Sequence, residues 1–107
     1  MGKETLCLNH NTSQCLTNYD VFLIDSVVGI DDWPWNGVLG LGPQAATHGP
    51  NMVTAFRDQG VIEKNIASIV YTRETDGSKL IFGGVPEKTV PIATHEVPQE
   101  WEETWTF

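Results

Sequence analysis

Short apolar, β-rich runs separated by polar and turn-forming residues dominate this sequence. They predict strands at residues 3–8, 19–28, 66–73 and 79–82, with further strand-like pieces at 92–97 and 104–107. Between the third and fourth runs, Asp76-Gly77 is a strong hairpin signal. Residues 9–18 are polar and predict a loop. This pattern is typical of a mainly β fold.

One segment predicts a short helix instead. Asn51 is a good N-terminal cap, and Gly60 is a fitting stop. Between them, Met52, Val53 and Phe56 fall on one helical face, which predicts packing against the core rather than a ligand site.

A turn-rich segment lies between the two halves of the chain. Residues 31–37 contain Pro34 and Asn36-Gly37, which favour turns, and residues 38–42 alternate apolar residues with glycine. This stretch is too short for a helix, and glycine within a strand often marks a close approach by another backbone.

Length and charge limit the possible functions. The 107 residues suffice for one small domain or part of a larger one, and 40% apolar content permits a packed core. A net charge of -8, from 6 basic and 14 acidic residues, argues against binding to nucleic acid or to an anionic membrane surface. No apolar run approaches the ~20 residues needed to span a bilayer.

Cys7 and Cys15 flank a short polar loop. A disulfide across this loop is favoured, two free thiols are the plainer alternative, and zinc is the weakest because no short ligand spacing is present. Asn11 begins an Asn-Thr-Ser glycosylation sequon inside the loop. A disulfide together with a sequon indicates the secretory pathway, with an extracellular or lysosome- or vacuole-like destination. The three histidines share no metal spacing, so we expect neither a metal nor a cofactor. They are His10, His48 and His95.

Four motifs resemble segments of pepsin-like aspartic endopeptidases, in the family's order. The first is Trp35-Asn36-Gly37-Val38-Leu39-Gly40-Leu41-Gly42, which resembles Phe-Asp-Gly-Ile-Leu-Gly-Leu-Gly. The others are Gln59-Gly60-Val61-Ile62, then Ala67-Ser68-Ile69-Val70-Tyr71, and then Leu80-Ile81-Phe82-Gly83-Gly84-Val85. The end, Trp105-Thr106-Phe107, resembles the strand that precedes the second catalytic motif of the family.

The resemblance implies that residues 1–107 are a partial pepsin-like domain. They would form part of the N-terminal lobe and the interlobe sheet of a two-lobed, mainly β protease with one short helix in this part. The family's two catalytic Asp-Thr-Gly or Asp-Ser-Gly motifs would lie before and after these residues, and neither occurs here. The complete protein is then expected to be an endopeptidase that acts on peptides or proteins, whereas this chain alone is expected to be inactive and to need the remainder of the protease.

By the same resemblance, Trp35 and Val38 match positions that line the pocket for the substrate residue before the scissile bond, with Ile30 nearby. Plain core packing is the alternative for Trp35 and Val38. Gly40 matches a glycine that packs behind the catalytic loop, and Gly37 and Gly42 are expected to be structural as well. Asn36 departs from the family's usual aspartate but keeps the ability to form a turn.

The carboxylates of this chain do not predict a catalytic site. Asp31 and Asp32 are adjacent, and neighbouring side chains on an extended chain point apart, whereas an aspartic dyad shares one proton at about 3 Å. Two other functions stay open: a non-catalytic pepsin-like module that binds peptides or proteins, and an unrelated small β-domain used for protein interaction.

Overall fold

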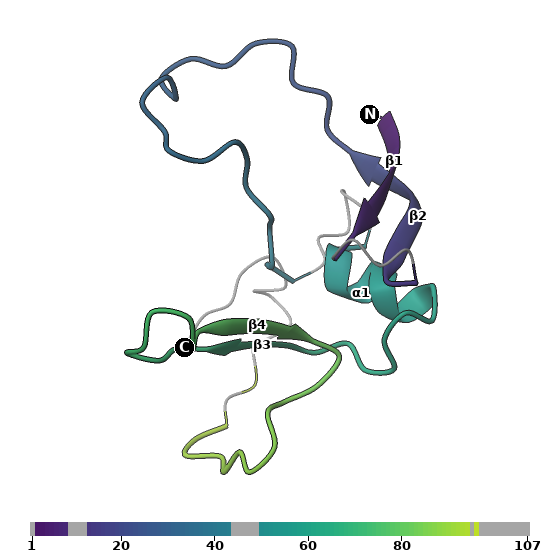
Figure 1. The fold of residues 1–107 in the computed structure, drawn as a ribbon. Helices are drawn as coiled ribbons and strands as arrows, with labels where there is room; N and C mark the ends of the chain where they lie inside the picture. Colours follow the sequence, from purple (N-terminus) through teal and green to yellow (C-terminus); the bar gives the residue numbers. More distant parts are fainter. Residues whose placement is uncertain (1, 9–12, 44–49, 95, 97–107) are drawn as a thin grey trace. The chain divides into compact units, whose positions relative to one another are not determined.

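A computed structural model describes residues 2–8, 13–43, 50–94 and 96 (Figure 1). The chain divides into two compact units, Met1–Gly40 and Leu41–Phe107, each of which is described here by itself. Across the described residues the fold is mainly β with one short helix, as the sequence predicts.

The first unit contains an antiparallel hairpin of β1 (Gly2–Cys7) and β2 (Cys15–Val21). Its register pairs Gly2 with Val21 at one end and Cys7 with Cys15 at the other. The register shifts between Glu4 and Leu6, where β2 holds one extra residue, and Asn18 there adopts a left-handed φ of 59°. An extra residue in one strand is a β-bulge, and asparagine tolerates this conformation better than most residues.

Two predictions about β2 are wrong. The strand begins at Cys15, inside the region predicted as a loop, and it ends at Val21, although a strand was expected over residues 19–28. The cause is pairing rather than propensity: β1 supplies cross-strand partners only from Gly2 to Cys7, so the ladder spans Val21 to Cys15. Residues 22–28 follow as irregular backbone despite their β-rich composition (Figure 1).

The second unit begins with the predicted helix, α1 (Met52–Asp58). The Asn51 side chain accepts a hydrogen bond from the Thr54 backbone N–H at 2.8 Å, which confirms the predicted cap. Gly60, at a φ of 74°, ends the helix. Its N–H donates to Arg57 and the Val61 N–H donates to Phe56, which is the Schellman pattern.

The predicted inner face of α1 is buried, with Phe56 fully enclosed. The Phe56 ring contacts that of Phe82, with centroids 5.8 Å apart. Thr54 is also buried, and its hydroxyl exchanges hydrogen bonds with the Asn65 side-chain amide at 3.0–3.3 Å. These contacts join the helix to the segment that follows it and to β4 (Lys79–Phe82).

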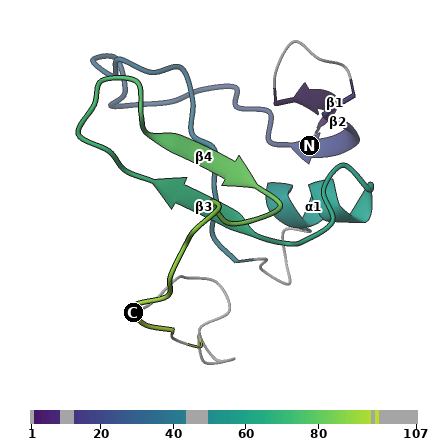
Figure 2. The same ribbon diagram turned by 60° about the horizontal axis from the view of Figure 1, so that its bottom comes forward.

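β3 (Ala67–Val70) pairs with β4 as an antiparallel hairpin, as predicted (Figure 2). It is shorter than the predicted 66–73 because Thr72 has left the ladder: its N–H donates to the Ser78 hydroxyl at 3.2 Å. At the other end, the Gly83 N–H donates to the Ile66 carbonyl at 2.8 Å.

The expected strand at 92–97 does not form in its described part, residues 92–94 and 96, and the piece at 104–107 lies outside the described residues. Within the part of the chain that the structure describes, no helix has the length and apolar character needed to cross a membrane.

Candidate substrate-binding segment

The first unit ends in an irregular segment, residues 29–40, which carries the predicted pocket residues. Its best-defined feature is a turn in which the Trp33 N–H donates to the Ile30 carbonyl at 3.0 Å. Asp31 and Asp32 are the two central residues of this turn, and Gly29 precedes it with a φ of 84°. The positive φ suits glycine, because it lacks the Cβ that other residues would strain.

Two tryptophans contact each other directly after the turn. The rings of Trp33 and Trp35 lie with centroids 5.4 Å apart and planes tilted by 47°, a geometry that aromatic pairs favour. Both stay about half exposed, at 47% and 55%. No role was predicted for Trp33 from the sequence. The signal was its i, i+2 spacing from Trp35, since alternate residues of an extended stretch lie on the same side.

The other predicted wall residues are also exposed. Val38 is 79% exposed and Ile30 37%, so neither packs as core in the described chain. Exposure is compatible with the wall of an open cleft, and their contact with substrate stays a prediction.

The glycines of the motif have open surroundings. A Cβ built on Gly37 or Gly40 meets no atom within 4 Å, so no described residue makes the close approach predicted at Gly40. The resemblance assigns that approach to a catalytic loop outside residues 1–107, and it stays a prediction. Gly42 has a defined partner, because its carbonyl accepts a hydrogen bond from the Asn51 side-chain amide at 2.9 Å. The sequence suggested Asn51 only as a cap and gave no sign of this second bond.

The titratable groups of the described residues were compared with the needs of a metal site. No group of three or more histidine, cysteine or carboxylate ligands occurs among them. Burial raises the pKa of the Tyr19 phenol, and the charge of the neighbouring Asp20 raises it further. Tyr19 therefore stays protonated at neutral pH. Asp20 also forms an ion pair with Lys3, at 2.6 Å, directly across the hairpin.

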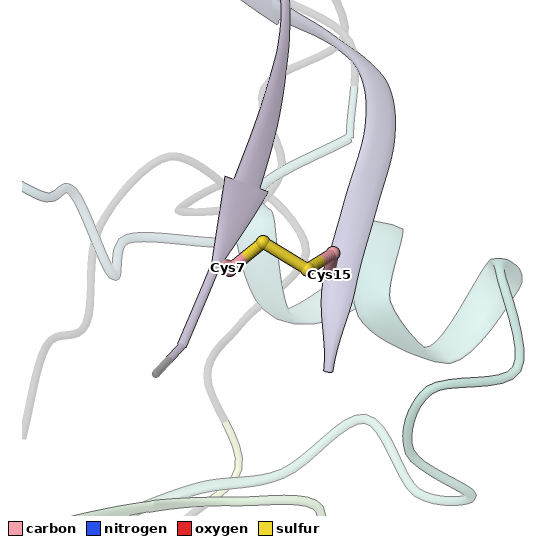
Figure 3. Close-up of a disulfide and its surroundings, with 2 residues drawn as sticks. All are labelled: Cys7 and Cys15. Carbon is pink, nitrogen blue, oxygen red and sulfur yellow. A yellow bond between two sulfur atoms is a disulfide. The ribbon is translucent and has the colours of Figure 1, made fainter. Parts of the chain in front are cut away.

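Cys7 and Cys15 form a disulfide, which confirms the favoured alternative (Figure 3). The two residues are direct cross-strand partners, with Cα atoms 4.0 Å apart. In an antiparallel ladder, directly opposite residues that are not hydrogen-bonded to each other have closer Cα atoms than hydrogen-bonded pairs. The short distance here matches the pair type without hydrogen bonds. The bond fixes the end of the hairpin next to residues 9–12, which lie outside the described residues and include the predicted glycosylation site Asn11.

Comparison with known proteins identifies the class. The family model of eukaryotic aspartyl proteases matches residues 15–107, so the chain belongs to that family. It is similar to embryonic pepsinogen of Gallus gallus, with 31% identity over 77 residues. The aligned part covers 66% of this chain but only 19% of that relative, so the chain spans about a fifth of the relative's length. No solved structure gives a significant match.

Proposed function

We propose that this chain is part of an aspartic-type endopeptidase and supplies substrate-pocket walls and lobe scaffold, but no catalytic carboxylate. The observation that carries the proposal is the family match over residues 15–107 in a sequence without Asp-Thr-Gly or Asp-Ser-Gly. Residues 1–107 are then a partial pepsin-like domain, and both catalytic aspartates belong to the remainder of the protease.

In such an enzyme two carboxylates share a proton and activate a water that attacks the peptide bond. The residues of this chain would act by binding. Trp35 and Val38, with Ile30 nearby, would contact the substrate side chain before the scissile bond. Their exposed apolar area favours this contact, because removing apolar surface from water contributes roughly 25 cal/mol per Å².

The exposed apolar side chains also need cover from the remainder of the protease. They concentrate between residues 22 and 39, where Phe22, Leu23 and Ile24 are each about 70% exposed. Large exposed apolar surfaces mark interaction sites in soluble proteins, and the exposure of this stretch supports the same role here. The proposed partners are therefore a peptide or protein substrate and the rest of the protease chain.

The Cys7–Cys15 disulfide supports a location in the secretory pathway, because disulfides persist in oxidising compartments. The similarity to a pepsinogen is consistent with a secreted or lysosome- or vacuole-like protease. Glycosylation at Asn11 is part of the same proposal.

The test uses the complete protein that contains this chain, with a denatured protein as substrate at acidic pH. We expect cleavage that pepstatin inhibits, and a fall in kcat/KM of about tenfold in Trp35→Ala, the usual cost of removing a good apolar pocket contact. Tyr71→Ala is the matched control, since it removes an aromatic side chain that is 84% exposed and that the resemblance does not assign to the pocket. Peptide binding without cleavage would contradict the proposal and favour a non-catalytic binding module.

A further inference from the structure

We propose that Trp33, Trp35 and the Asp31-Asp32 turn form a site for a positively charged side chain, arginine or lysine, of the bound peptide. This inference rests on the proposed function and adds a substrate preference to it. Trp33 then acts as a second specificity-determining residue beside Trp35.

The aromatic part of the site is the tilted Trp33–Trp35 pair. Its ring centroids are 5.4 Å apart, and about half of each side chain is open to solvent. A cation over the face of an indole is attracted by the negative charge of the ring face, and tryptophan is the strongest partner for this contact. The apolar stem of arginine or lysine can pack on one ring while the charged end stays hydrated.

The acidic part of the site is the turn that precedes the two rings. The Trp33 N–H closes the turn on Ile30, which holds Asp31 and Asp32 immediately before the aromatic pair in the chain. Both aspartates are exposed, and among the described residues neither forms an ion pair. Their negative charge is therefore available to a ligand.

The neighbouring sequence supplies no lysine or arginine to compete for the site. Residues 4–56 contain no lysine or arginine. Lys3 is the one basic residue of this kind in the first unit, and it is already paired with Asp20 at 2.6 Å. A negatively charged peptide is disfavoured here, whereas a cationic one gains both from the carboxylates and from the rings.

The experiment compares matched peptide substrates of the complete protein. The peptides differ at one position, on the side before the scissile bond. This position carries arginine, lysine, leucine or glutamate, and kcat/KM is measured for each peptide. We expect the arginine and lysine peptides to exceed the glutamate peptide by about tenfold at low salt, and the ratio to fall as salt is added. In the D31N/D32N double variant, and separately in Trp33→Leu, we expect the arginine-to-leucine ratio to fall about threefold or more.

Asp25→Asn is the matched control, because it removes a carboxylate of the same unit outside the turn. We expect it to leave the ratio unchanged. An arginine-to-leucine ratio that is the same in the wild type, the double variant and Trp33→Leu would overturn the inference while leaving the protease proposal intact.

Two other outcomes separate the two proposals. If no peptide is cleaved, the protease proposal fails. The inference is then decided by the arginine-to-leucine ratio of the peptide binding affinities, measured in the wild type and in the same variants. If the Trp33→Phe/Trp35→Phe double variant does not lower the fraction of tryptophan fluorescence that acrylamide quenches in the complete protein, these two residues are covered there and the inference is overturned.

Discussion

Gly83 occupies a position that leaves no room for a larger residue. Its φ is 92°, a conformation that strains residues with a Cβ. A Cβ built there would lie 2.9 Å from the Cβ of Ile62, closer than real contacts allow. Because Gly83 also donates to Ile66, its backbone cannot move away without losing the hydrogen bond that extends the hairpin.

We therefore expect Gly83→Ala to lower the free energy of unfolding of the complete protein by about 2–4 kcal/mol, the sum of backbone strain and overpacking. Gly84→Ala is the control, since a Cβ on Gly84 meets nothing within 4 Å. Urea unfolding of both variants measures the difference. Equal unfolding midpoints for the two variants would show that Gly83 is not constrained in this way.

At the scale of elements, Asn51 links α1 to the end of the glycine motif. Its side-chain oxygen accepts from the Thr54 N–H, and its side-chain nitrogen donates to the Gly42 carbonyl. Aspartate at this position keeps the acceptor and suits the positive helix N-terminus, but it lacks the donor. Alanine lacks both groups.

Asn51→Ala is thus expected to destabilise the protein by about 1–2 kcal/mol, mostly through the lost cap. Asn51→Asp should keep the helix stable while loosening the segment that ends at Gly42. Hydrogen exchange can separate the two effects: protection of the Thr54 amide falls only in the alanine variant, whereas protection around Gly42 falls in both. A wild-type exchange pattern around Gly42 in the aspartate variant would show that the hydrogen bond from Asn51 to Gly42 has no effect on this segment.

Local signals predicted the elements that depend on nearby residues. Asn51 and Gly60 bounded α1 correctly, and Asp76-Gly77 identified the β3–β4 hairpin, because caps and tight turns are specified within a few residues. The limits of β2 were missed because they depend on how far β1 extends, which is information from elsewhere in the chain. In the candidate site, the resemblance supplied Trp35, Val38 and Ile30. The contact of Trp33 with Trp35 and the hydrogen bond from Asn51 to Gly42 could be seen only in the structure.

At the scale of the whole molecule, the described sheets are small and much apolar surface is open. Each sheet has two strands, and two-stranded sheets are marginally stable alone. Large apolar side chains at least two-thirds exposed include Phe22, Leu23, Ile24, Val28, Val38, Tyr71, Val90 and Ile92. Open strand edges add templates for pairing between chains.

The isolated 107-residue chain is therefore expected to self-associate or to remain loosely packed. Sedimentation velocity over a range of concentrations measures the association. Urea unfolding, followed by far-UV circular dichroism and tryptophan fluorescence, measures the packing. A monomer with one sharp transition in both signals, independent of concentration, would instead show a self-sufficient domain and favour the interaction-module alternative.

The central claim is that this chain binds and supports but does not catalyse, and a cleavage assay tests it most directly. The isolated chain and the complete protein are incubated with denatured globin at acidic pH, with and without pepstatin. We expect pepstatin-sensitive cleavage from the complete protein and none from the isolated chain, because two carboxylates sharing a proton are needed and no catalytic motif occurs in residues 1–107. Pepstatin-sensitive cleavage by the isolated chain would contradict the account.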